Sequence, residues 1–425
     1  MSNYKSGGRS VAAWCKLRES SNNNHGSKMQ LHFNYWRVGS SIPQHPDERG
    51  IGYDLKRYAS AAYKKIRPKR HAEKSDFLDI GVMVTPFDDL KDVEGICIYL
   101  PVPLDAEDIK DLGPLFKNTN VATGIFNERL EVRQESSRRV ELGNQEGQFC
   151  RVHNFSTSNN GCIDDQYLKV EPYKGGTKLT ITSAAIQAAH REINKQKWIY
   201  FRFRVFINNS GRNSFVKTIR PEDKFILSGF HATEYVDFRL NEARNLPPEV
   251  EELMEDAEET GVVPIVRIDF LLVLRVGADL DGGHTNYHKS RLLERELWLD
   301  YVPDGGSDAL QEGMVIYHWR EKKDSGSEVG FQPSKPKRPL RKSRRSSPED
   351  STAQEVLSKR DAGIKEFNAF VKLNIRVSNW KTVALSLSII VILGAAGSYF
   401  GSLITSYLSS SVDHQDVYLF TIMPK

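Results

Sequence analysis

The sequence predicts an α+β protein, with a sheet-rich cytoplasmic region followed by a helical stalk and one C-terminal transmembrane helix. Short apolar segments recur between residues 79 and 319, and two amphipathic segments interrupt them. One long uncharged run covers residues 382–408 in a chain whose mean hydropathy is −0.49. These observations favour a soluble region joined to a membrane anchor.

The strand predictions depend on β-branched and aromatic residues bounded by turn residues. The predicted strands are residues 79–87, 95–104, 198–207, 224–230, 234–240, 264–276 and 314–319. After residue 207, Asn208-Asn209-Ser210-Gly211 is a turn signal, so we expect a hairpin there. Helical spacing of apolar residues predicts helices over 53–66, 183–196 and 247–261.

Composition divides the chain into six parts. Residues 1–50 are rich in Ser, Asn and Gly and are expected to be loosely ordered. A helix start at Ser347-Pro348 and helical spacing from Leu357 to Val371 predict a stalk. The expected parts are a loose N-terminal segment (1–50), an α+β region (51–320), a basic linker (321–347), a helical stalk (348–381), a transmembrane helix (382–408) and an external tail (409–425).

The uncharged run is long enough to cross a membrane. As a helix it spans about 40 Å, and a bilayer has a hydrocarbon core of roughly 30 Å. Lys and Arg outnumber acids before the run, and two aspartates follow it. The positive-inside tendency therefore predicts a single-pass protein of the cell inner membrane, with a cytoplasmic N-terminal region. The four scattered cysteines suit a reducing cytoplasm and form no metal-ligand spacing.

Small residues follow one face of the predicted membrane helix. Gly397 and Gly401 form a GxxxG pair, and Gly394, Ser398 and Thr405 lie on the same face. They can be incidental in a lipid anchor, or they can let copies of the helix pack closely. In a ring of four or more copies, this face could line an uncharged pore.

A basic stretch lies before the stalk. One interpretation is a contact with anionic lipid headgroups, which the following membrane helix favours. The alternatives are a nucleic-acid contact and a solvated linker. The residues are Lys335, Lys337, Arg338, Arg341, Lys342, Arg344 and Arg345.

Catalytic motifs are missing from the sequence: it contains no GxSxG, GxxxxGK[ST], HExxH or GxGxxG. Asp279, Asp281, His284 and His288 form one metal-like cluster, and the alternative interpretation is a polar turn after a strand. We therefore expect neither an enzyme nor a cofactor.

One face of the 198–207 strand combines aromatic and cationic residues. Rings and guanidinium groups on a sheet suit stacking on bases and pairing with phosphates. The residues expected to bind a nucleotide or oligonucleotide are Trp198, Tyr200, Arg202 and Arg204. The alternative is a second layer over this face, with the arginines paired to acids such as Glu234 or Asp237.

The order of parts resembles bacterial anti-phage membrane effectors and is similar to the Hailong-type effector, especially over residues 350–408. The resemblance implies a homo-oligomer, a tetramer or larger, that forms a channel. It also implies an oligonucleotide ligand made by a partner nucleotidyltransferase. Two rival hypotheses are a tail-anchored scaffold without a ligand and a membrane-tethered, metal-dependent hydrolase that uses the Asp279–His288 cluster.

Overall fold

The structure is a computed structural model. It describes residues 9–18, 26–38, 76–85, 93–158, 160–191, 198–207, 211, 214–219, 231–276, 278–280, 287–303, 310–311, 313–323, 363–376 and 380–412. The chain divides into two units, Met1–Lys217 with Tyr235–Leu373, and Thr218–Glu234 with Asn374–Lys425. The described part is sheet-rich and mixed α+β, as predicted.

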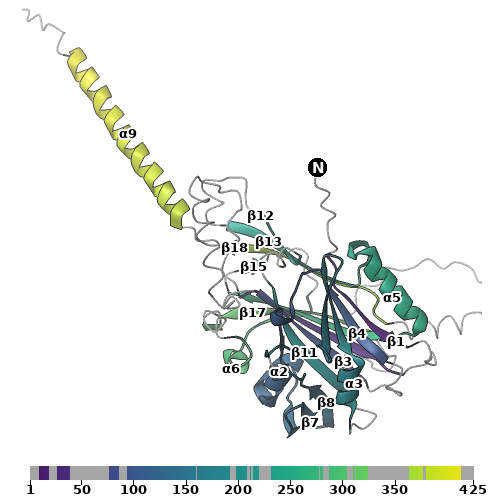
Figure 1. The fold of residues 1–425 in the computed structure, drawn as a ribbon. Coiled ribbons are helices and arrows are strands. Elements are labelled where there is room, and N and C mark those ends of the chain that lie inside the picture. The colour runs from purple at the N-terminus through teal and green to yellow at the C-terminus, as the bar shows by residue number, and fades with distance from the viewer. Residues whose placement is uncertain are drawn as a thin grey trace, which may run out of the picture. The chain divides into compact units, whose positions relative to one another are not determined.

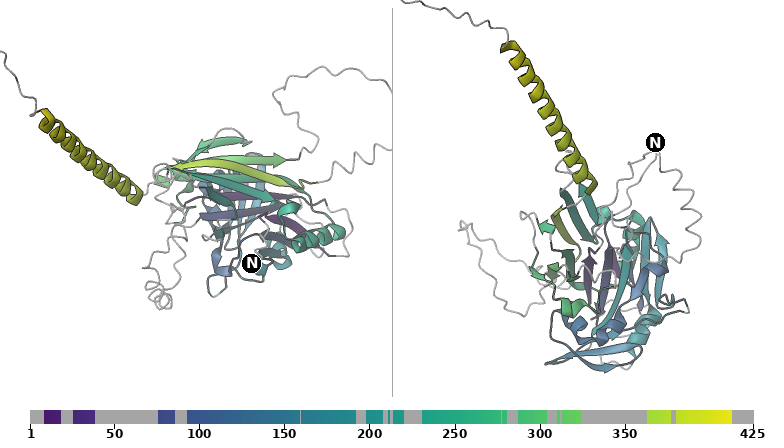
Figure 2. Two further views of the ribbon diagram at one scale, coloured as in Figure 1. Left: turned by 90° about the horizontal axis from the view of Figure 1, so that it is seen from above. Right: turned by 90° about the vertical axis from the view of Figure 1, so that its left-hand side faces the viewer.

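A ten-stranded mixed sheet dominates the described part of the first unit (Figures 1 and 2). The strand order is β16-β17-β14-β2-β3-β11-β8-β7-β6, and β5 pairs with β11. β14 runs parallel to β2, and β11 runs parallel to β8. The strands are β2 (Met29–Trp36), β3 (Asp76–Val84), β5 (Ile109–Asp111), β6 (Glu131–Glu135), β7 (Arg139–Asn144), β8 (Gly147–His153), β11 (Trp198–Ile207), β14 (Ile265–Arg275), β16 (Lys289–Leu292) and β17 (Met314–Lys322).

The central strands of this sheet are buried on both faces. Every residue of β3 is buried, and so are nearly all residues of β2 and β11. The predicted strands over 198–207, 264–276 and 314–319 are confirmed, and so is the part of 79–87 up to Val84, whereas residues 86 and 87 lie outside the described residues. Side chains on each face therefore meet another layer of the protein.

A smaller sheet has the order β1-β4-β10-β9. Its strands are β1 (Ala12–Leu17), β4 (Val93–Leu100), β9 (Leu168–Tyr173) and β10 (Gly176–Thr182). Helix α5 (Pro248–Thr260) lies beside β1 and β4 (Figure 1), where Trp14 and Tyr99 pack with Val250. Helix α3 (Ser183–His190) follows β10, and Arg151 donates to the carbonyls of Ala189 and Arg191 at its C-terminal end. The predicted helix over 247–261 is confirmed, as is the described part of 183–196.

Two helices, α2 (Thr119–Phe126) and α6 (Arg295–Trp298), contact each other and cover part of the large sheet. Trp36 of β2 meets Trp298 edge-on at 5.3 Å between ring centroids. A side chain at Gly124 of α2 would press on the Trp298 ring, so the glycine permits this close approach. This layer positions the C-terminal end of α2 against the sheet.

A third sheet has the order β12-β13-β18-β15. Its strands are β12 (Val216–Ile219), β13 (His231–Leu240), β15 (Ala278–Leu280) and β18 (Phe367–Arg376). The predicted hairpin after residue 207 is wrong, because β12 pairs with β13 and not with β11. The turn signal ends one strand, but the next strand belongs to another sheet.

Three of the expected boundaries are corrected. Within residues 1–50, β1 and β2 are buried strands and not loose chain, because their apolar residues fill two sheets. β17 extends to Lys322, past the expected start of the linker at residue 321. Residues 367–376 of the expected helical stalk form strand β18, because Phe367, Ala369, Val371 and Leu373 alternate into the core. The predicted helix over 53–66 and most of the linker lie outside the described residues.

The C-terminal helix is confirmed. Helix α9 (Trp380–Val412) contains Leu387–Leu408, which is long and apolar enough to cross a membrane. This result is consistent with a single-pass membrane protein. Three residues separate its start from the end of β18.

Candidate functional site

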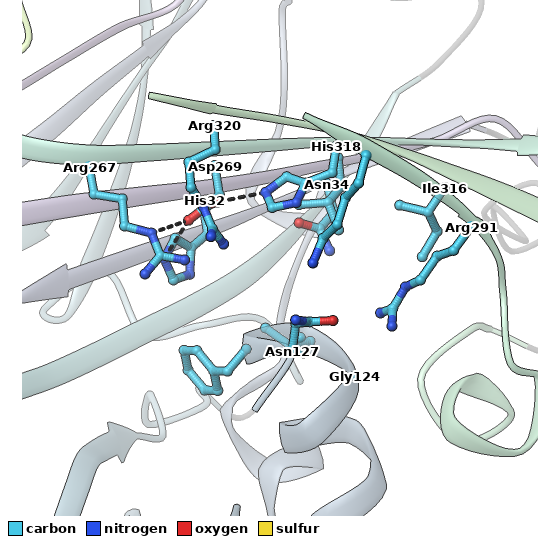
Figure 3. Close-up of a pocket in the computed structure, with 14 residues that line it drawn as sticks. His32, Asn34, Gly124, Asn127, Arg267, Asp269, Arg291, Ile316, His318 and Arg320 are labelled. Atoms are coloured by element: carbon cyan, nitrogen blue, oxygen red, sulfur yellow. Dashed lines mark hydrogen bonds and ion pairs between the residues drawn. The ribbon is translucent and has the colours of Figure 1, made fainter. Parts of the chain in front are cut away.

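A pocket lies between one face of the large sheet and the C-terminal end of α2 (Figure 3). The strands β2, β14, β16 and β17 supply its polar wall, and Asn127 faces that wall from the end of α2. Asn127 has a left-handed backbone (φ 53°), which asparagine adopts more readily than most residues and which ends the helix here. The polar residues around the pocket are His32, Asn34, Asn127, Arg267, Asp269, Lys289, Arg291, His318 and Arg320.

Strand register explains why these side chains meet. Asp269 of β14 pairs with His32 of β2 on one side and with Arg320 of β17 on the other. Lys289 of β16 pairs with His318 of β17. Paired residues share a face and alternate residues return to it, so one face collects polar groups from four strands.

Asp269 is the centre of the polar wall. Its carboxylate accepts from Arg267 Nε at 2.5 Å, from Arg320 Nε at 2.7 Å and from His318 Nε2 at 2.6 Å. Burial alone would raise the pKa of Asp269. The His318 hydrogen bond and the nearby positive charges outweigh burial and hold the pKa well below its usual range. Asp269 is therefore an anion that orients two guanidinium groups.

The pocket has more positive than negative charge. Arg267, Arg320, Lys289 and Arg291 line it, and Asp269 is the one carboxylate among its lining residues. Burial lowers the pKa of Lys289, and the charges of Arg291 and Arg320 lower it further. Cations held close together without matching acids create a site that attracts anions.

His32 is buried in this site without a hydrogen bond. Its side chain is 8% exposed, and neither ring nitrogen has a hydrogen-bond partner among the described residues. Nε2 lies 3.8 Å from Asp269, and burial lowers the pKa of His32 to about 3. Buried polar groups are nearly always bonded, so a neutral imidazole here is suited to a bound ligand or water.

The enclosed space is small. Its volume for a water-sized molecule is about 30 Å³, roughly two to three times what a single water needs. A space of this size suits a compact polar group better than a nucleobase. The side chains of Arg267 and Arg320 are each 29% exposed, so the site opens to solvent.

The residues predicted to bind a ligand on β11 are not accessible. Arg202 and Tyr200 are 0% exposed, Arg204 is 2% exposed, and Trp198 is partly buried against the same core. The expectation of an exposed ligand surface is therefore corrected: a second layer covers this face, as the alternative proposed. The layer includes Tyr301, which follows α6.

The arginines of β11 are paired, but not with the expected acids. Arg204 makes two bonds to Asp79, at 2.6 and 3.1 Å, and Tyr301 donates to the same carboxylate at 2.6 Å. Arg202 donates to the hydroxyls of Tyr301 and Tyr200, both at 2.8 Å. Tyr200 lies across Gly81, where any side chain would collide with its hydroxyl. Asp79 thus replaces Glu234 and Asp237 as the counter-ion.

This buried network reaches the pocket through Asn34. With its amide oriented to satisfy both neighbours, Asn34 accepts from Arg202 Nη2 at 3.0 Å and donates to the Phe33 carbonyl at 3.1 Å. Asn34 also lines the pocket. The β11 arginines therefore support the wall of a site that lies on the neighbouring strands.

The structure describes only part of the predicted metal-like cluster and none of the predicted lipid-binding stretch. Within the described part of the chain, no group of three His, Cys, Asp or Glu residues could hold a metal ion. Asp281 and His284 lie outside that part, and His288 packs edge-on against His318 at 5.9 Å. The seven basic residues between 335 and 345 also lie outside it.

The small residues of α9 are exposed in the single chain. A Cβ atom at Gly394, Gly397 or Gly401 would meet nothing within 4 Å in the part of the chain that the structure describes. Thr405 donates to the Gly401 carbonyl at 2.9 Å within the helix. This face is open to another helix, but the Thr405 hydroxyl proton is already used.

The sequence reasoning missed the pocket, although a signal was present. Charged or histidine residues alternate at 267 and 269, at 289 and 291, and at 318 and 320. Such alternation along a strand marks a polar face. It shows which residues share a face of one strand, but not which strands are neighbours.

Comparison with known proteins adds no relative: no family model, curated protein or solved structure matches the chain.

Proposed function

We propose that this chain is a single-pass membrane effector whose soluble region binds an anionic, phosphate-bearing ligand of the nucleotide or oligonucleotide class. The observation that carries the proposal is that four cationic side chains line one pocket together with the buried, unbonded His32. Arg267 and Arg320 each donate to Asp269 through Nε alone. Their Nη groups have no hydrogen-bond partner among the described residues and can donate to a ligand. Guanidinium forks of this kind suit phosphate oxygens.

The membrane part of the proposal is supported by Leu387–Leu408. We propose that the chain lies in the cell inner membrane with its soluble region in the cytoplasm, and that several copies assemble into a channel. A bacterial antiviral defence role, with a ligand made by a nucleotidyltransferase, follows from the resemblance in the order of parts. The open small-residue face of α9 is compatible with assembly.

Packed aromatic rings connect β14, which lines the pocket, to β18 within the first unit. Phe270 follows Asp269 on β14 and faces the other side of the sheet, where it stacks on Phe238 of β13 at 4.4 Å. Phe238 in turn meets Phe367 of β18 at 6.3 Å. Three residues join β18 to α9 along the chain, so we propose that a shift of β14 on ligand binding reaches the membrane helix through β18.

Binding and ion flux test this proposal together. The full-length chain in detergent is titrated with 5′-phosphorylated diadenylate by calorimetry and then reconstituted into K⁺-loaded liposomes. We expect binding and a change in K⁺ release. Lys289→Gln should weaken binding at least tenfold, because a charge-assisted contact is lost.

Arg244→Gln is the matched control, because Arg244 is exposed and bonds Glu242 away from the pocket. Its binding and flux should equal those of the natural chain. Absence of binding would contradict the receptor function. Binding without any change in flux would contradict the channel and favour a ligand-binding membrane anchor.

A further inference from the structure

The charges facing the pocket do not cancel. Arg267, Lys289, Arg291 and Arg320 carry four positive charges. Asp269 neutralises one of these charges, and Glu294 neutralises another through Arg291 at 3.4 Å. Because burial keeps His32 and His318 neutral, two positive charges remain without a partner among the described residues.

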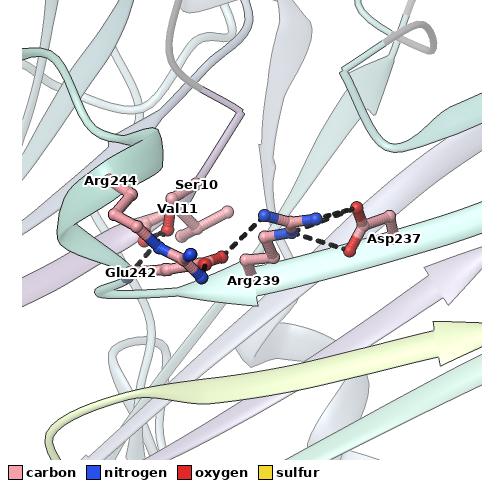
Figure 4. A network of polar contacts seen from close by, with 6 residues as sticks. All are labelled: Ser10, Val11, Asp237, Arg239, Glu242 and Arg244. Carbon is pink, nitrogen blue, oxygen red and sulfur yellow. Dashed lines mark hydrogen bonds and ion pairs between the residues drawn. The ribbon is translucent and has the colours of Figure 1, made fainter.

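A surface cluster of similar composition shows the contrast (Figure 4). Arg239 bonds Asp237 at 2.7 Å and Glu242 at 2.8 Å, and Arg244 bonds Glu242 at 2.7 Å. Two arginines there pair with two carboxylates, so the charges of this cluster cancel without a ligand. In the pocket, by comparison, the surplus of two charges remains to be neutralised.

The donors converge on one small space. The amino groups of Arg267 and Arg320, the Lys289 ammonium and the His32 ring come from four different strands around a volume of about 30 Å³. The opposite wall is the C-terminal end of α2, where helix carbonyls repel an anion. An anionic group is therefore held against the sheet, with its remaining atoms directed to the mouth.

We infer that the pocket binds a terminal phosphate, a phosphomonoester dianion, and not an internal phosphodiester. This inference rests on the proposed function and narrows its ligand class. A phosphomonoester carries a charge of about −1.5 to −2 at pH 7 and presents three free oxygens. A phosphodiester carries one charge, presents two such oxygens and continues on both sides, so it fits less well into a small space that opens at a mouth.

A pair of nucleotides with the same base and sugar tests the inference. The full-length chain in detergent is titrated at pH 7.5 with 5′-AMP, a monoester, and with 3′,5′-cyclic AMP, a diester. We expect 5′-AMP to bind at least tenfold more tightly than cyclic AMP. Inorganic phosphate should compete with 5′-AMP.

Variants show whether binding occurs in this pocket. Lys289→Gln and Arg291→Gln on β16 should each weaken 5′-AMP binding at least tenfold, and Arg244→Gln should leave it unchanged. Both β16 residues are only partly buried, and an unchanged melting temperature confirms folding. Binding of 5′-AMP that neither variant weakens would overturn the inference.

The same monoester chemistry occurs in a lipid headgroup. Dihexanoyl phosphatidic acid is therefore titrated beside 5′-AMP, with dihexanoyl phosphatidylglycerol as its diester control. Tighter binding of phosphatidic acid than of 5′-AMP assigns the ligand to the membrane, and the reverse order assigns it to the cytoplasm. Either order supports a terminal phosphate, provided that each monoester exceeds its diester tenfold.

Failure of this inference differs from failure of the proposed function. If 5′-phosphorylated diadenylate binds in a Lys289-dependent manner but cyclic AMP binds as tightly as 5′-AMP, the receptor function stands and the monoester inference is wrong. If no phosphate compound binds, both are wrong.

Discussion

At the scale of single residues, Asp269 is an acid in a site proposed to bind anions. Its negative charge opposes an anionic ligand, yet it also holds Arg267 and Arg320 through their Nε atoms. Removing the Asp269 charge would strengthen ligand binding through the first effect and weaken it through the second. A substitution can therefore show which effect dominates.

We predict that Asp269→Asn weakens 5′-AMP binding at least tenfold, although it makes the pocket more positive. The amide gives a weaker acceptor to two guanidinium groups, which then lose their fixed orientation. Calorimetry of the folded variant measures the effect. Tighter binding would instead mean that net charge, and not arginine orientation, determines affinity.

His153 shows how buried histidines make stability depend on pH. It is 3% exposed, packs against Phe155 and Phe201, and has no hydrogen-bond partner for Nε2 among the described residues. Burial, together with the charges of Arg138 and Arg151, lowers its pKa to about 4. The unfolded chain takes up this proton near pH 6.5, so stability falls as pH decreases from 6.5 towards 4.

His153→Phe should reduce this pH dependence. The ring replacement preserves the aromatic packing but cannot bind a proton. Between pH 7.5 and pH 5, the natural chain should lose about 2 kcal/mol more free energy of unfolding than the variant. Denaturant unfolding at the two pH values measures the difference. Identical losses would show that His153 keeps its ordinary pKa in the fold, and a smaller loss in the natural chain would show that the fold favours the protonated ring.

At the scale of elements, the sequence predicted strands better than it predicted their partners. Alternation identified β11 correctly, and runs of β-branched and aromatic residues identified β3 and β14. In β18, the spacing of Ile364, Phe367 and Val371 fits a helix, but Phe367 and Val371 also belong to an alternating strand pattern. This short segment fits both a helical and a strand periodicity. Only its packing against β13 and β14 decides that it forms a strand.

The pocket was beyond sequence reasoning for a related reason. Its walls come from residues near 32, 124, 269, 290 and 318, and no local pattern shows that these segments are neighbours. The aromatic and cationic face of β11 was recognised correctly, but its exposure was not. Whether a second layer covers a strand depends on residues such as Tyr301, about one hundred positions away.

The aromatic contacts between β14, β13 and β18 should be important for stability. Phe238 is 1% exposed and touches the rings of Phe270 and Phe33 at 4.4 and 4.9 Å. Phe238→Ala should lower the free energy of unfolding by about 3–5 kcal/mol, because it leaves a cavity between two sheets. Thermal and denaturant unfolding measure the loss.

Phe370 of β18 provides the control. Its side chain is 47% exposed and its ring touches Tyr235 at 5.9 Å. Phe370→Ala should cost well under half as much as Phe238→Ala. Equal losses would show that the aromatic contacts do not form the main packing between these strands.

At the scale of the whole molecule, the central question is whether copies of α9 associate. Gly394, Gly397 and Gly401 lie on one side of the helix, and a Cβ at each would meet no described residue within 4 Å. Helices in a bilayer gain little from the hydrophobic effect, so close backbone packing over small residues is a main source of affinity. An effector that forms a path for ions needs such packing in several copies.

We predict that Gly397→Leu with Gly401→Leu reduces the assembly size of the full-length chain in detergent and abolishes ligand-dependent K⁺ release. Leucine side chains would separate the backbones, whereas ligand binding in the soluble region should persist. Ala396→Leu is the matched control, because its helical position lies on the opposite face. Native mass spectrometry measures the assembly. If the double variant keeps the natural assembly size and flux while Ala396→Leu disturbs them, the interface lies on the other face of α9.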